Sequence, residues 1–320
     1  MRLPTVRTLE KNTAGRDFVV GDIHGMFARS LDAFLQAVQF DETKDRVISV
    51  GDLVDRGPGS SDALKYLRNP WFYAVYGNHE DMLVHFVKGD NAGSDVYGSP
   101  GSWNHSFILN GGEWFLDMRA RHKSNAEELV DMIAELPDIL VVGDGPSRYN
   151  VVHAELVHAF DEKTGQITFY KDSDVDNSFS EFADDPPQHI IGFDTIGSMR
   201  DGFLWGRRLV YLEKAVKAGR YKDVYFGHPS LTSGLSPTFC GHTILKSPQI
   251  AYSHVRIDTG AYKSVKPNEM AYLTIAEPLA GRIWQVGRSN IIKEGIPLLD
   301  PLDRPRDGAA TDPQRESRSL

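Results

Sequence analysis

Residues 71–80 read WFYAVYGNHE, an apolar run that ends in a glycine followed by an amide, an imidazole and a carboxylate. The part from 71 to 75 is typical of a buried strand, because it is short, rich in aromatic residues and bounded by polar residues. The polar end, Asn78, His79 and Glu80, indicates no chemistry by itself, since Asn-His pairs are common in turns. Its meaning depends on the stretches before and after it.

Two similar units precede this stretch. Residues 18–20 form an apolar run that ends in Gly-Asp-Ile-His-Gly at 21–25, and residues 47–50 form another that ends in Gly-Asp-Leu-Val-Asp-Arg-Gly at 51–57. Apolar residues at helical spacing follow each of the three runs. The pattern predicts an α/β fold with a parallel sheet and right-handed crossovers. In such sheets, polar residues at the carboxyl ends of the strands converge on one crevice.

The later part of the chain predicts more strands and fewer helices. A helix is expected near 129–136, and two strands at 139–142 and 149–152 flank a turn, the second delivering His153 to its end. We expect a second sheet built from runs at 224–226, 255–258, 270–275 and 283–286. Together, the predicted strands and helices indicate one domain over residues 1–300, with two central mixed β-sheets flanked by helices.

Two segments differ in composition from the rest. Between residues 161 and 185 the chain has eight Asp or Glu residues and only two lysines, and two prolines follow. This pattern predicts a surface insertion over about 161–187, folded as a solvated flap. Residues 301–320 contain no aromatic residue and alternate in charge, which predicts a disordered tail.

Composition excludes some classes of protein. The 320 residues carry a formal net charge of -9, which argues against a nucleic-acid backbone as the main partner, because phosphate binding calls for clustered Lys and Arg. Cys240 is the only cysteine, so no internal disulfide can form. The N-terminus lacks the apolar run of a signal peptide, and no stretch approaches the roughly 18 apolar residues of a membrane span. We therefore expect a cytoplasmic protein without a membrane partner.

Side chains with metal-ligating chemistry follow the predicted strands. They are Asp22, His24, Asp52, Asp55, Asn78, His79, His153 and one of the later histidines. This set offers nitrogen and oxygen donors without a thiolate, which suits Mn²⁺, Fe or Zn²⁺ in five- or six-coordinate geometry better than a structural zinc site. The number of donors implies two metal ions.

The three blocks at 21–25, 51–57 and 77–80 resemble, in order and spacing, the signatures of metallophosphoesterases of the phosphoprotein phosphatase type. Further motifs resemble the branch formed by the bacteriophage lambda protein phosphatase and its bacterial relatives, and they lie at 104–105, 109–112, 114–115, 152–154, 204–208, 241–243 and 257–261. The resemblance implies a calcineurin-like fold and a hydrolase that removes phosphate from serine and threonine, and also tyrosine, of phosphoproteins or phosphopeptides. It implies two divalent metal ions, with Mn²⁺ expected and Fe or Zn²⁺ as alternatives, and a hydroxide bridging them as nucleophile.

The resemblance also implies which residues hold the metal ions. Asp22, His24 and Asp52 would hold the first ion, and Asp52, Asn78, His153 and His242 the second. Asp52 would bridge the two, because dications about 4 Å apart repel each other and need a shared negative ligand.

Four more residues receive roles from the resemblance. His79 would be the general acid that protonates the leaving group, and Asp55 would orient its ring. Arg56 and Arg207 would bind the phosphoryl group, since a planar guanidinium can hold two of its oxygens at once. Glu80 is assigned no chemical role.

The last metal ligand has a competitor. His228 also follows an apolar run and a glycine, so its local pattern is as suitable as that of His242. We favour His242 because its distance from the Asp258 motif resembles the spacing in the phage-type enzymes, whereas His228 would require a long extra loop.

Two other functions stay open. Symmetrical bis(5′-nucleosyl)-tetraphosphatases share the early blocks but more typically have aspartate where this chain has Glu80, which favours the protein phosphatase branch. A non-catalytic module that binds metal or phosphate is the third possibility, although every expected ligand and His79 are present.

Overall fold

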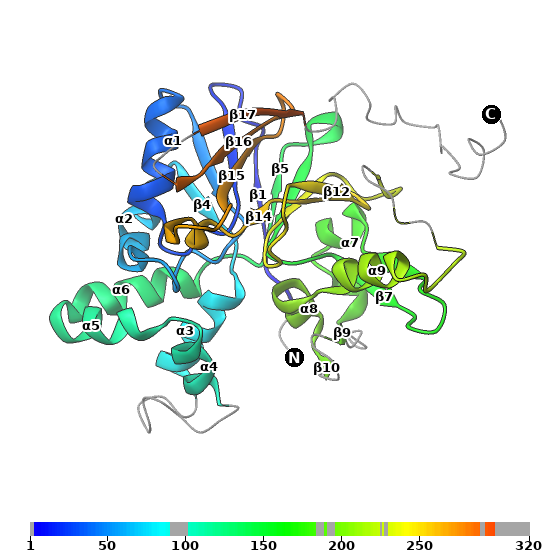
Figure 1. The fold of residues 1–320 in the computed structure, drawn as a ribbon, viewed down its shortest axis with the longest axis horizontal. Helices are drawn as coiled ribbons and strands as arrows, with labels where there is room; N and C mark the ends of the chain where they lie inside the picture. The colour runs from blue at the N-terminus through cyan, green and yellow to red at the C-terminus, as the bar shows by residue number, and fades with distance from the viewer. Residues whose placement is uncertain are drawn as a thin grey trace.

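The computed structural model describes residues 3–89, 102–183, 189–190, 196–224, 226, 230–288 and 292–297. Two mixed sheets lie face to face, and helices cover their outer faces (Figure 1). The predicted α/β architecture with two central mixed sheets flanked by helices is confirmed. None of the helices in these ranges is both long and apolar enough to cross a membrane.

The first sheet contains the three predicted strand-and-helix units. Its order is β17-β16-β15-β2-β3-β4, with β14 beside β15. Strands β2, β3 and β4 are parallel, and β15 is antiparallel to β2. The strands are β2 (Asp17–Val20), β3 (Arg46–Ser49), β4 (Phe72–Ala74), β14 (Asp258–Thr259), β15 (Tyr272–Glu277), β16 (Arg282–Val286) and β17 (Ile292–Pro297).

Six helices share an apolar cluster with the outer face of this sheet, with α4 packed on α3 and α5 on α6. Phe18 and Val20 of β2 pack into the apolar cluster with the helices, whereas Val19 packs toward the other sheet. Because both faces of β2 are buried, its residues 18–20 are continuously apolar rather than alternating. The helices are α1 (Asp32–Ala37), α2 (Ala63–Leu67), α3 (Asn78–Lys88), α4 (Trp103–Leu109), α5 (Glu113–Arg121) and α6 (Lys123–Ala134), with helical turns at Phe27–Leu31 and Ser60–Asp62.

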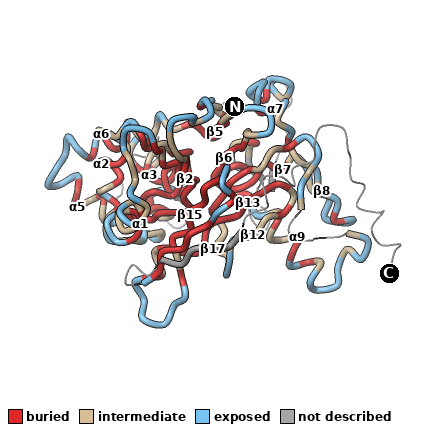
Figure 2. The backbone as a smooth tube through the Cα atoms, turned by 90° about the horizontal axis from the view of Figure 1, so that it is seen from above, coloured by how far each residue is buried: buried red, intermediate tan, exposed pale blue. Residues whose placement is uncertain are grey.

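The second sheet has the order β1-β5-β6-β11-β13-β12 and mixes parallel with antiparallel pairs. Buried side chains of both sheets form one cluster between them, and Figure 2 shows the buried strands at the centre of the molecule. The strands are β1 (Val6–Leu9), β5 (Ile139–Val142), β6 (Tyr149–Val152), β11 (Thr238–Cys240), β12 (Gln249–Ala251) and β13 (His254–Arg256), with short turns at Gly145–Ser147 and Ala261–Val265.

The predicted make-up of the second sheet is wrong. Of the four runs assigned to it, the run at 255–258 contributes to β13 of this sheet and to β14 of the first, while those at 270–275 and 283–286 form β15 and β16 of the first sheet. Val224 and Phe226 are not in a strand, and the second sheet contains β11 instead of that run. An apolar run indicates a strand but not its partner, because pairing depends on contacts far apart in the chain.

The acidic segment is not a solvated flap. It begins after β7 (Val157–Phe160) and contains β8 (Ile167–Phe169), α7 (Asp172–Asp176) and a turn at Ser180–Phe182. Tyr170, Val175 and Phe179 are fully buried against the outer face of the second sheet, together with residues of α8 (Met199–Trp205). Among the described acidic residues, Asp161, Glu162, Asp176 and Glu181 are exposed, whereas Asp172 accepts hydrogen bonds from Asn150 and Ser236. The strands β9 (His189–Ile190) and β10 (Ile196–Gly197) and helix α9 (Arg208–Lys217) complete the elements, and residues 184–187 and 301–320 lie outside the described ranges.

Candidate active site

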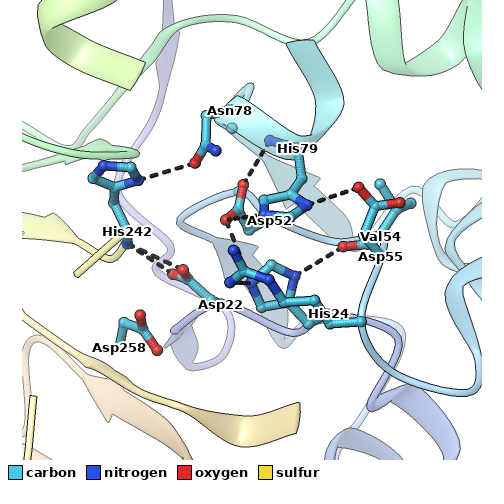
Figure 3. A network of polar contacts seen from close by, with 12 residues as sticks. Asp22, His24, Asp52, Val54, Asp55, Asn78, His79, His242 and Asp258 are labelled. Carbon is cyan, nitrogen blue, oxygen red and sulfur yellow. Dashed lines mark hydrogen bonds and ion pairs between the residues drawn. The ribbon is translucent and has the colours of Figure 1, made fainter. Parts of the chain in front are cut away.

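The loops that leave five strands bring the predicted site residues together. Asp22 and His24 follow β2, Asp52 follows β3, and Asn78 and His79 begin α3 after β4. The second sheet adds His153 after β6 and His242 after β11. Each of these side chains is buried, with at most 8% of its surface exposed, and Figure 3 shows those of Asp52, Asn78, His79 and His242 pointing into one space.

The backbone of these loops is in an unusual conformation. His24, Asp52, Asp55, Arg56 and His242 all have φ between 45° and 69°, in the left-handed region that non-glycine residues rarely adopt. Each such residue costs of order 1 kcal/mol or more, and residues of this kind cluster at functional sites. The concentration at this one place indicates that the fold holds these side chains in position at some cost in stability.

Asp52 lies at the centre of the group. Its Oδ2 is 3.4 Å from His24 Nε2 and its Oδ1 is 3.3 Å from His153 Nε2. The backbone N–H of His79 also donates to Oδ1, at 3.0 Å. Burial opposes ionisation of Asp52, but the imidazoles of His153, His79 and His24 hold its pKa below the usual range. One carboxylate therefore faces histidines on both sides.

Asn78 provides a second point of convergence. Its Oδ1 is 2.8 Å from His153 Nε2 and 2.9 Å from His242 Nδ1. The Nδ1 of His153 faces the carbonyl of Val50 at 2.8 Å, which assigns the proton to Nδ1 and leaves the Nε2 lone pair toward Asp52 and Asn78. His24 is oriented in the same way by the carbonyl of Val54. Such hydrogen bonds are typical of histidines that bind metal.

The protonation states suit metal ligands. Burial lowers the pKa of His24, His153 and His242, so these imidazoles are neutral near pH 7. Burial also raises the pKa of Asp22, and the neighbouring carboxyls of Asp258 and Asp52 raise it further. Crowded buried carboxylates of this kind are stabilised by a cation.

Two groups of donors could each hold a metal ion. His24, Asp52 and His79 form one, and Asp22, Asp52 and His153 form the other, with the donor atoms of each within 4.8 Å of one another. Asp52 belongs to both, as a bridging ligand would, but the division differs from the predicted one, because His79 stands beside His24 and Asp22 stands beside His153. The buried Nε2 of His242 has no hydrogen-bond partner in the described part of the chain. These observations fit a site for two ions with nitrogen and oxygen ligands.

The family follows from a match over most of the sequence. Residues 18–243 match the model of the calcineurin-like phosphoesterases. The chain belongs to this family. The predicted family and its fold are thereby confirmed. A calcineurin-like phosphoesterase is expected to have a metal centre, and the donor groups around Asp52 are suited to one.

Several characterised proteins are similar to this phosphoesterase over part of its length. Serine/threonine-protein phosphatase 1 of Salmonella typhimurium is 39% identical over 138 residues, which is 43% of this chain and 58% of that protein. Serine/threonine-protein phosphatase 2 of Escherichia coli is 35% identical over 139 residues, 43% of this chain and 57% of that protein. A symmetrical bis(5′-nucleosyl)-tetraphosphatase of Coxiella burnetii is 44% identical over 70 residues, 21% of this chain and 23% of that protein. The chain thus spans less than two thirds of these relatives.

The residues predicted to handle substrate border the phosphoesterase centre. His79 Nδ1 is 2.7 Å from Asp55 Oδ2, and neither side chain is exposed. Arg56 lies with Nη1 2.9 Å from His24 Nε2 and its guanidinium over the ring of Tyr262. Arg207 precedes α9, and its charge acts on both His153 and His242. The predicted acid and the two cations thus surround the predicted ligands.

Sequence reasoning missed the part played by Glu80. Its buried carboxylate accepts hydrogen bonds from the backbone N–H groups of Asp52 at 2.8 Å, Leu53 at 2.9 Å and Gly77 at 3.0 Å. It therefore joins the loop after β3 to the start of α3. Its place three residues after Gly77, as in a capping box, was the signal that could have revealed this.

The competition between His242 and His228 leads to a metal-counting prediction. His228 lies outside the described residues, whereas His242 Nδ1 reaches Asn78. We expect His242→Ala to retain one of two metal ions, as counted by atomic mass spectrometry after reconstitution. His254→Ala is the control, because His254 is also buried but accepts a hydrogen bond from the backbone N–H of Leu156. Two ions in His242→Ala would exclude His242 as a necessary ligand.

Proposed function

We propose that this calcineurin-like phosphoesterase is a metal-dependent protein phosphatase that hydrolyses phosphoserine and phosphothreonine. The observation that carries the proposal is the pair of donor groups that share Asp52, next to the buried pair of His79 and Asp55. The two serine/threonine-protein phosphatases support it, since their similarity extends over about twice as many residues as that of the tetraphosphatase.

The ligands would divide between two divalent ions, for which Mn²⁺ remains our expectation. Asp22, His24 and Asp52 would hold one, and Asp52, Asn78, His153 and His242 the other. When bound, such a pair of ions lowers the pKa of a water molecule and polarises the phosphoryl oxygens.

His79 would donate a proton to the leaving oxygen from Nε2. That atom is buried and has no hydrogen-bond partner in the described residues, while Nδ1 faces Asp55. Burial lowers the pKa of His79 to about 3 and raises that of Asp55. Both shifts disfavour an ion pair between an imidazolium and a carboxylate. An incoming phosphate dianion would favour the imidazolium form, because a nearby negative charge raises the pKa of histidine.

Arg56 and Arg207 would bind and orient the phosphoryl group. Burial lowers the pKa of Arg207, and the carboxylate of Asp52 acts against that shift. The guanidinium therefore stays charged beside the site. Two such groups could hold the equatorial oxygens and stabilise the charge that develops on them in the transition state.

The substrate test sets a phosphopeptide against a dinucleotide. With Mn²⁺ supplied, we expect phosphate release from a phosphoserine or phosphothreonine peptide and little ADP release from diadenosine tetraphosphate. Preferred hydrolysis of the dinucleotide would instead support the tetraphosphatase. A protein that holds two metal ions and is inert toward p-nitrophenyl phosphate would be a binding module.

A further inference from the structure

Asp55 has a second partner besides His79. The carboxylate is completely buried and uses one oxygen for each neighbour. Its Oδ2 lies 2.7 Å from His79 Nδ1, and its Oδ1 accepts a hydrogen bond of 2.7 Å from Nε1 of Trp114. The indole N–H can only donate, so it fixes which oxygen of Asp55 remains for the imidazole. Trp114, Asp55 and His79 thus form a chain that ends at the predicted proton donor.

The turn between α4 and α5 is shaped to bring Trp114 there. Gly111 has φ of 95°, and a Cβ at this residue would lie 2.7 Å from the backbone nitrogen of Arg56. A Cβ at Gly112 would lie 2.4 Å from the ring of Phe107. Glycine at 111 allows the turn to approach the loop after β3 so closely, and glycine at 112 leaves room for the ring of Phe107. Trp114 follows in the first turn of α5, where its ring also packs against the helical core.

Asp55 requires such a fixed partner. It lies on a loop with φ of 69°, and a buried carboxylate with a single partner would be free to rotate about its side-chain torsions. Burial raises the pKa of Asp55, whereas the indole hydrogen bond acts in the opposite direction. Trp114 therefore favours both the charge and the orientation that His79 needs.

We propose that Trp114 is a positioning residue, which aligns Asp55 and through it the imidazole of His79 for proton transfer to the leaving group. The inference rests on the proposed phosphatase function and adds a residue to it. The indole N–H of Trp114 donates to Asp55, so its effect on His79 would pass through that carboxylate.

The test is Trp114→Phe, which keeps an aromatic ring but removes the N–H. A serine alkoxide must be protonated as it leaves, whereas p-nitrophenolate is a good leaving group and needs little help. We expect kcat on a phosphoserine peptide to fall by about 10- to 100-fold, as for outer partners of site residues, with little change in KM. On p-nitrophenyl phosphate kcat should fall by less than about threefold. An equal fall on both substrates would overturn the inference.

Trp71→Phe is the matched control, because Trp71 is a buried tryptophan whose N–H has no partner in the described residues. It should leave the ratio of the two rates unchanged. A second readout needs no activity: in the metal-free protein, the indole N–H signal of Trp114 in a ¹H–¹⁵N spectrum should be protected from exchange. Asp55→Gly, which suits the positive φ, should shift that signal and remove the protection. An unchanged signal would refute the link to Asp55, whereas an inactive wild type with the expected signal would refute only the phosphatase.

Discussion

Asp52→Asn is expected to lose both metal ions and to lower kcat on a phosphopeptide by about 10³-fold or more. Asp52 is the residue common to the two donor groups, with one oxygen toward His24 and the other toward His153. Asparagine has nearly the same shape and could still accept the hydrogen bond from the backbone of His79. It lacks the negative charge, however, and its NH₂ group cannot ligate a cation.

The measurement is metal content after reconstitution with Mn²⁺ and removal of free ions, together with kcat. Asp45→Asn is the matched control, since Asp45 is equally buried and precedes β3, whereas Asp52 follows it. Asp45 pairs with Arg16 at 2.5 Å, so its loss should lower stability but not the number of ions. If Asp52→Asn kept two ions, a bridging role would be excluded.

The candidate site could be predicted largely because its early residues are local. Asp22, Asp52 and Asn78 each stand within a few residues of the strand that positions them, and the three strands are consecutive and parallel. In such units the chain direction alone places the loops at one edge of the sheet. The position of these residues at strand ends was therefore enough to predict that their side chains converge, without any knowledge of tertiary contacts.

The sheet pairing could not be predicted in this way. Strand β15 lies antiparallel beside β2, and β11 lies between β6 and β13. Each pair joins residues far apart in the chain, and the apolar runs do not differ in any feature that would specify the neighbour. His242 was chosen for its spacing from the Asp258 motif, and in the structure it follows the end of β11, whose last residue is Cys240.

The prediction that the acidic segment is a solvated flap was wrong because it relied on the average charge of the segment. Its carboxylates are numerous, but Tyr170, Val175 and Phe179 recur every four or five residues and form one buried side. Since packing free energy depends on apolar area buried, three such side chains outweigh a solvated acidic face. The part of Trp114 could not be predicted either, because it depends on which side chain the fold brings to its indole N–H, whereas Glu80 stood at a capping-box position.

Glu80→Ala is expected to lower the free energy of unfolding by about 3–5 kcal/mol. The change leaves the backbone N–H groups of Asp52, Leu53 and Gly77 buried without their acceptor. Each unsatisfied donor costs about 1–3 kcal/mol, although water entering the cavity would recover part of this. Urea unfolding of the metal-free protein measures the change directly, with no contribution from bound ions.

The same substitution should also weaken metal binding, because the loop that Glu80 holds carries Asp52 in a left-handed conformation. Glu80→Asp keeps the carboxyl group on a shorter side chain and should fall between wild type and Glu80→Ala in both measurements. Glu128→Ala is the control: Glu128 forms a solvent-exposed pair with Arg68, and such pairs contribute little to stability. If Glu80→Ala were as stable as the control, the hydrogen bonds to Glu80 would not be what fixes the loop after β3.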